Sequence, residues 1–303
     1  MTQAIDREIQ AQPGNPLGLD GIEFIEYATS RPQALGQVLE AMGFRPIARH
    51  RSREVLLYRQ GEMNVVINAH GGGRTGSIVP AETPVIAAVA LRVRDAAAAC
   101  ARALERGAWA VPTPVEVMEL NIPAIHGVGA SRIYFVDRYR EFSIWSVDFV
   151  PIPDVDQHPP PVAGLHWFGI VQYIDVDRMD DWCEFYRELF GFAELPDDKR
   201  FGIMPNGKIL ASPCKSFYLQ LVEPVPDLVD VECEEMLQRI GLGTPSVPAA
   251  VAALRARGVE FFEGGEVHSN ENGALTQRWM DSVMFELVHD TREPPARLGA
   301  ATT

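Results

Sequence analysis

The chain contains a long-range internal repeat, and this repeat constrains its fold more than any other feature. The segments LDGIEFIEYA, from Leu19, and LHWFGIVQYI, from Leu165, both have the residue alternation of a strand. Each is followed by a run with helical spacing that ends in Met-Gly-Phe or Phe-Gly-Phe. Gly43 and Gly191 in these endings suit the left-handed C-cap of a helix. The sequence therefore predicts two related halves.

Each half contains a second copy of this strand and helix. VIAAVALRVRD leads into AAAACARALERG, and MLQRIGLGTP leads into VPAAVAALRARG, with Gly107 and Gly258 as the predicted helix caps. Short alternating runs follow each helix. This order predicts an α+β fold of four β-α-β-β-β modules that form two domains, each a curved, partly closed sheet with its helices outside. We predict an N-terminal domain over residues 1–152, a Pro-rich linker over 153–161 and a C-terminal domain over 162–303.

Composition excludes several classes of function. The net charge of −14 opposes binding to nucleic acid, because a polyanion needs a basic partner surface. The sequence lacks an apolar stretch long enough to cross a membrane, and its polar N-terminus lacks the apolar core of a signal peptide. The cysteines are dispersed, without C-x-x-C spacing, which favours reduced thiols. We expect a cytoplasmic homo-oligomer that binds a small molecule and neither nucleic acid nor a membrane.

The amino-acid sequence of the first half resembles that of a known enzyme family. NPLGLDGIEFIEYA, MGFRPIARHRSREVLLYRQGEMNVVIN and MELNIPAIHGVG, between Asn15 and Val150, resemble bacterial 4-hydroxyphenylpyruvate dioxygenase of the vicinal oxygen chelate superfamily, which also includes glyoxalases, bleomycin resistance proteins and extradiol dioxygenases. RMDDWCEFYRELFGF and SFYLQLVEP continue the resemblance in the second half. The resemblance implies a non-catalytic N-terminal domain. It also implies a C-terminal domain that holds Fe(II) through two histidines and one glutamate.

Two of the three implied metal ligands are present in the second half. His166 matches the first histidine and Glu286, in VMFELV, matches the carboxylate. Where the family has Gln-His, the strand MLQRIGLGT has Gln238 and Arg239. Arginine cannot replace a histidine ligand, because its guanidinium stays protonated and offers no lone pair. We expect His268 or a water to take the missing position, and the alternative for His268 is a surface loop residue.

Three further residues are candidates for substrate contact. Arg239 is expected to pair with a substrate carboxylate, and the alternative is a buried ion pair with Glu286. Gln220 can face the cavity, and Gln277 matches the glutamine that orients the keto acid in the family. Both glutamines are equally compatible with ordinary strand polarity. In the first half the matching first-strand position is Glu23, with no second ligand evident, so the predicted site lies in the second half.

Three functions remain open at this stage. The leading hypothesis is a non-haem Fe(II) oxygenase, resembling 4-hydroxyphenylpyruvate dioxygenase, that acts on an aromatic 2-oxo acid or a related small acid. The second is a metal-dependent lyase or isomerase of the same fold. The third is a metal-free small-molecule binding protein with an Arg239–Glu286 pair where the metal was. The first two functions need a divalent metal, for which Fe(II) is the leading candidate. The third needs no cofactor.

Overall fold

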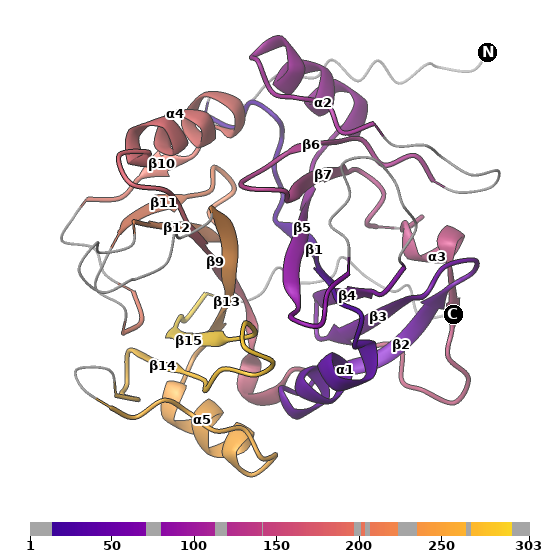
Figure 1. Cartoon of the computed structure of the whole chain (residues 1–303), viewed down its shortest axis with the longest axis vertical. Helices are drawn as coiled ribbons and strands as arrows, with labels where there is room; N and C mark the ends of the chain where they lie inside the picture. The colour runs from indigo at the N-terminus through magenta and orange to yellow at the C-terminus, as the bar shows by residue number, and fades with distance from the viewer. Residues whose placement is uncertain are drawn as a thin grey trace, which may run out of the picture.

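A computed structural model describes residues 14–70, 80–112, 120–140, 142–196, 201–203, 207–223, 235–264 and 268–292. These residues form a mixed structure of two β-sheets that lie side by side, with helices α1, α2, α4 and α5 at the periphery (Figure 1). The N-terminal sheet has eight strands in the order β6-β7-β5-β1-β4-β3-β2-β8. The C-terminal sheet has seven strands in the order β10-β11-β12-β9-β13-β15-β14. In the part of the chain described, neither sheet closes into a barrel.

The elements of the N-terminal half belong to its sheet or cover it. In chain order they are β1 (Ile22–Ala28), α1 (Pro32–Ala41), β2 (Arg45–His50), β3 (Val55–Gln60), β4 (Met63–Asn68), β5 (Val85–Arg92), α2 (Ala96–Glu105), β6 (Ala124–His126), β7 (Arg132–Val136), α3 (Trp145–Asp148) and β8 (Phe149–Pro151).

The C-terminal half begins with a short helical turn. Its elements are η1 (Val162–Gly164), β9 (His166–Tyr173), α4 (Met179–Phe190), β10 (Ala193–Glu194), β11 (Lys208–Ala211), β12 (Tyr218–Val222), β13 (Met236–Thr244), α5 (Val247–Arg255), β14 (Gly273–Leu275) and β15 (Phe285–His289).

The first and third repeat units have the predicted element order, β1-α1-β2-β3-β4 and β9-α4-β10-β11-β12. The described residues of the second and fourth units have other sets of strands, so the fourfold module is not confirmed. The predicted helix ends are observed: the backbone takes positive φ at Gly43 (100°), Gly107 (92°), Gly191 (79°) and Gly258 (90°), where glycine avoids the strain of a side chain. The domain and linker bounds stay predictions.

A β-bulge occurs at the same place in the central strand of each half. The pairing of β1 with β5 skips Glu23, and the pairing of β9 with β13 skips Phe168. The residues of β5 and β13 that face the two bulges lie the same number of residues before the helix that follows each strand, α2 or α5. The two bulges are therefore at equivalent positions. Glu23 therefore corresponds to Phe168, and the counterpart of His166 is Gly21, not Glu23 as expected from the sequence. Phe168 and the next residue, Gly169, both line a pocket.

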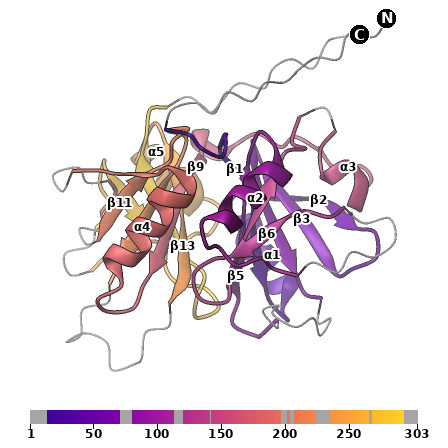
Figure 2. The same cartoon turned by 90° about the horizontal axis from the view of Figure 1, so that it is seen from above.

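One hydrophobic core joins the two halves. Its buried residues come from both sheets, and strands β5 and β13 contact each other between them (Figure 2). The ring of Phe135 on β7 stacks on that of Phe190 at the end of α4, with 6.2 Å between centroids. Arg257, just after α5, donates to the carbonyl oxygens of Glu40 (2.6 Å) and Ala41 (2.9 Å) at the end of α1. In the residues described, no helix is long and apolar enough to cross a membrane.

Candidate functional site

A pocket lies on the inner face of the C-terminal sheet. Strands β9, β12, β13 and β15 provide most of its wall, because residues that alternate along adjacent strands face one side. Gly241 leaves room beside the pocket, since an added Cβ would meet no atom closer than 3.4 Å, whereas an added Cβ at Gly169 would come 2.3 Å from the backbone oxygen of Tyr218. The pocket is lined by Phe168, Gly169, Ile170, Val171, Phe201, Ile209, Tyr218, Gln220, Gly241, Glu286 and Val288.

Aromatic side chains form one wall of this pocket. The ring centroids of Phe168, Phe201 and Tyr218 lie 4.8 to 5.2 Å apart in each pair, within the range of favourable aromatic contact. Gly202, which follows Phe201, lies against the carboxylate of Glu286, and a Cβ added there would come 2.3 Å from Oε1. The segment around Phe201 therefore packs directly on both the aromatic wall and this carboxylate.

Arg239 and Glu286 form a buried ion pair, of which Glu286 lines the pocket. Nε of Arg239 donates to Oε2 of Glu286 at 3.0 Å, and the side chains are 2% and 4% exposed. Nη1 of Arg239 donates to Oε1 of Gln238 at 2.8 Å. Nη2 is buried and has no hydrogen-bond partner among the described residues. The structure therefore brings together the two residues for which the sequence predicted either an ion pair or separate roles.

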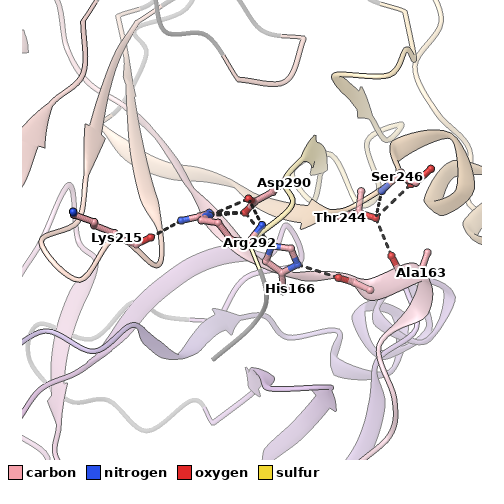
Figure 3. A network of polar contacts seen from close by, with 8 residues as sticks. Ala163, His166, Lys215, Thr244, Ser246, Asp290 and Arg292 are labelled. Atoms are coloured by element: carbon pink, nitrogen blue, oxygen red, sulfur yellow. Dashed lines mark hydrogen bonds and ion pairs between the residues drawn. The ribbon is translucent and has the colours of Figure 1, made fainter. Parts of the chain in front are cut away.

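His166 belongs to a second polar network (Figure 3). Its Nε2 lies 3.0 Å from Oδ2 of Asp290, and its Nδ1 lies 3.0 Å from the carbonyl oxygen of Gly164. Both partners are acceptors, so both contacts are hydrogen bonds only when both ring nitrogens carry a hydrogen. The ring also lies over Gly243, where an added Cβ would come 2.5 Å from Nε2. In this arrangement neither nitrogen of His166 is free to bind another group.

Asp290 links His166 to Arg292. Burial raises the pKa of Asp290, but hydrogen bonds from His166 and Arg292 outweigh this and hold the pKa well below its usual value. Arg292 donates to Asp290 through Nε (2.8 Å) and Nη2 (2.6 Å), and to the carbonyl oxygen of Lys215 through Nη1 (2.6 Å). Its guanidinium lies 4.8 Å from the ring centroid of Tyr218 and 5.4 Å from that of Phe168. The network thus ends on the aromatic wall of the pocket.

The metal implied by the family resemblance does not fit these residues as they are arranged. His166 uses both ring nitrogens, Glu286 is paired with a cation, and the third position holds Arg239. Among the residues that the structure describes, no group of three or more His, Cys, Asp or Glu side chains is placed to hold a metal ion. A face of two histidines and one carboxylate is therefore not formed.

The remaining candidates are dispersed. Gln220 lines the pocket, as expected from strand parity. His268 is 60% exposed and lies 3.7 Å from Glu263, so the structure does not bring it together with His166 and Glu286. Gln277 is exposed, and its backbone N–H donates to the carbonyl of Glu260. The proposed roles of these residues stay predictions.

Sequence reasoning missed Asp290 and Arg292. Strand parity could have found Asp290, because residues 286, 288 and 290 alternate onto one face of the last strand. Its contact with His166, which is 124 residues away in the chain, depends on the tertiary fold. Arg292 follows the last strand and offered no periodic signal. The two residues account for the environment of His166.

In the N-terminal half, the counterpart of the pocket is filled by structural contacts. Glu23 forms an ion pair with Arg92 and accepts a hydrogen bond from Nε1 of Trp145 at 2.7 Å. Burial raises the pKa of Glu23, and the contact with Arg92 opposes this rise. An open surface hollow lies nearby, lined by Asp137, Arg138, Arg140, Phe142, Ser146 and Val147. Its residues do not include Glu23, and they resemble a solvated surface more than a binding pocket.

Comparisons with known proteins agree with the arrangement of both halves. A family model described as "Hydroxyphenylpyruvate dioxygenase, HPPD, N-terminal" matches residues 14–150. The 4-hydroxyphenylpyruvate dioxygenase of Pseudomonas aeruginosa is 32% identical over 263 residues, which cover 82% of this chain and 72% of that protein. Hemolysin VllY of Vibrio vulnificus is 34% identical over 263 residues, which cover 82% of this chain and 73% of that protein.

Solved structures show the same fold over nearly the whole chain. A triple-substituted 4-hydroxymandelate synthase from Streptomyces coelicolor superimposes with a TM-score of 0.71, covering 94% of this chain and 95% of that one. The sequence identity in this comparison is 15%, so the likeness concerns the fold alone. The similarity to the dioxygenases in sequence and the similarity in fold thus extend across both sheets.

Proposed function

We propose that this chain, which belongs to the 4-hydroxyphenylpyruvate dioxygenase family and is therefore a dioxygenase-like enzyme, acts on a small aromatic carboxylic acid. An aromatic 2-oxo acid is the first candidate. The substrate would bind in the pocket of the C-terminal sheet. Relatives named for 4-hydroxyphenylpyruvate make this compound the first ligand to test.

The single observation that carries this proposal is the composition of the pocket wall. Phe168, Phe201 and Tyr218 line a pocket that also contains Glu286, whose partner is the cation Arg239. Aromatic side chains stack favourably on an aromatic ring, and a guanidinium binds a carboxylate through charge-assisted hydrogen bonds. The pocket therefore has an aromatic wall for a ring, and the cation Arg239 behind Glu286 would attract an acid group.

Within this proposal each residue has a defined role. The three rings bind the ring of the substrate and exclude water, because they cover one side of the pocket. Arg239 orients the carboxylate. Gln220, on strand β12, lines the pocket, and its amide would hydrogen-bond a keto oxygen, since an amide both donates and accepts.

We further propose that the reaction depends on oxygen. Membership of a dioxygenase family supports oxygen-dependent chemistry over the lyase or isomerase alternative. The Fe(II) that the resemblance implies would supply oxygen activation when bound, but His166, Arg239 and Glu286 do not form a site for it in this structure. The pocket residues would bind and orient the substrate.

Ligand binding and oxygen uptake test the proposal together. Isothermal titration with 4-hydroxyphenylpyruvate and phenylpyruvate should give saturable binding, and an oxygen electrode should record uptake with a substrate of this class, with and without added Fe(II). Gly241→Val should abolish binding, because a Cβ there meets only ordinary contacts, at 3.4 Å or more, and the added methyl groups fill the pocket. Gly264→Val is the matched control, since it adds the same group outside the pocket. If no aromatic 2-oxo acid binds, the proposal is rejected.

A further inference from the structure

We infer that Arg239 binds the ligand carboxylate directly, in the place where the family resemblance implies a metal ion, so that ligand binding by this pocket is independent of metal. The inference rests on the proposed function, which supplies the class of ligand. It concerns the binding step and adds no chemical step.

The first argument is the incomplete hydrogen bonding of Arg239. Nε is used by Glu286 and Nη1 by Gln238, while Nη2 is buried without a partner in the described structure. A buried donor that has lost its water without gaining an acceptor is unfavourable, and most buried donors in proteins are paired. A carboxylate is the acceptor that fits a guanidinium best, because charge assistance strengthens both hydrogen bonds.

The second argument is the geometry of the ion pair. Arg239 contacts Glu286 through one nitrogen and one oxygen, at 3.0 Å, and not through two parallel hydrogen bonds. The guanidinium therefore keeps part of its edge for a second carboxylate. Arg239 and the pocket residue Gly241 lie two residues apart on β13, so their side chains share one face of the strand, and the guanidinium lies behind Glu286, which lines the pocket.

The third argument is that the positions implied for metal binding serve other contacts. A divalent ion bound to Glu286 would lie beside the guanidinium of Arg239, and like charges at that range repel strongly in a site shielded from water. His166 is held by Asp290 and the carbonyl of Gly164. Through Asp290 it fixes Arg292 on the rings of Phe168 and Tyr218, which makes His166 a positioning residue of the aromatic wall.

The test compares ligand binding with and without metal. Wild-type protein is treated with a chelator, and 4-hydroxyphenylpyruvate and phenylpyruvate are titrated by calorimetry into this sample and into samples supplemented with Fe(II) under anaerobic conditions or with Mn(II). We expect the same Kd in all samples. Arg239→Met should weaken binding by about tenfold to a hundredfold, the usual value of hydrogen bonds to a charged group, and Arg239→Lys should lose less because it keeps a point charge.

Two further variants keep the test decisive. Arg239→Met alone strands Glu286 and could unfold the protein, so the double variant Arg239→Met/Glu286→Leu removes both members of the buried pair, a change that proteins usually tolerate. It should fold and fail to bind. Arg255→Met is the control, because Arg255 forms an exposed pair with Glu263 at 2.8 Å and should leave binding unchanged.

The outcomes separate this inference from the proposed function. Binding that appears only after a metal is added overturns the inference and leaves the proposed function standing. Unchanged binding by the folded double variant also overturns it. If wild-type protein binds no aromatic carboxylate under any condition, the proposed function fails and the inference falls with it.

Discussion

Nε of Arg239 lies 3.0 Å from Oε2 of Glu286, and both side chains are almost completely removed from solvent. They come from adjacent parallel strands, β13 and β15. Burying two charges is costly, and their attraction offsets the cost only while both are present. Each residue is therefore required by the other, whatever the pocket binds.

Neutralising the carboxylate should destabilise the protein. Glu286→Gln removes the charge with little change of shape and leaves Arg239 as an unpaired buried cation. We expect the free energy of unfolding in urea to fall by about 3 to 5 kcal/mol. Glu263→Gln breaks an exposed pair and should cost less than about 1 kcal/mol. A small, equal effect of both changes would contradict the burial of the pair. His268→Ala should also cost less than Glu286→Gln in stability and in ligand binding, since His268 is exposed.

Restoring the histidine of the family should not by itself restore a metal site. Arg239→His strands Glu286 and should lower stability by about 3 to 5 kcal/mol. His166 remains engaged with Asp290, so Co(II), as a spectroscopic probe, should bind weakly. Arg239→His/Asp290→Asn should bind Co(II) more tightly, because the anionic partner of His166 is removed. Tight Co(II) binding by the single variant, with stability preserved, would show that His166 turns freely.

The stability contributed by Asp290 should depend on pH. Its pKa in the folded protein lies below the unfolded value of about 3.9, so its contribution is complete above that pH and is lost as the pH falls toward the folded value. The difference in unfolding free energy between wild type and Asp290→Asn should therefore shrink as the pH falls below about 4. Thermal unfolding at a series of pH values measures this. A difference that grows as the pH falls would have the wrong sign.

A single methyl group should displace His166. Gly243→Ala places a Cβ within 2.5 to 3.0 Å of three atoms of the imidazole ring, so the ring must move away from Asp290. We expect weaker binding of aromatic acids, because Arg292 loses the partner that holds it on Phe168 and Tyr218. Gly241→Ala, two residues earlier on the same strand, meets nothing closer than 3.4 Å and provides the comparison for stability. Chemical shifts of the His166 ring protons would report the displacement directly.

The sequence predicted the architecture well because its signals are local. Glycine at a left-handed helix end is a property of one residue, and Gly43 and Gly191 behave as expected. The family resemblance directed attention to His166, Arg239 and Glu286, which lie on the adjacent strands β9, β13 and β15 of one sheet. The contacts of these residues did not follow in the same way: the ion pair was one of two alternatives, and the pairing of His166 with Asp290 joins distant parts of the chain.

The bulges show where a comparison of sequences reaches its limit. Alternation along a strand identifies the residues that share a face only while the pairing is regular. Glu23 and Phe168 are each the extra residue of a β-bulge, and this changes which positions of the two halves correspond. A charged residue in one half and an aromatic residue in the other then occupy equivalent places, which similarity of residue type would not suggest.

The contact of Arg257 with the end of α1 affects how the molecule can move. Its guanidinium joins the end of α5 in one half to the end of α1 in the other, and the buried core continues between the same two halves. Hinge opening between the halves would expose that core, so we expect the two halves to move as one body. For the same reason, the backbone amides of strands β5 and β13 should be protected from hydrogen exchange to the same degree. They should lose this protection together, in a single global unfolding transition.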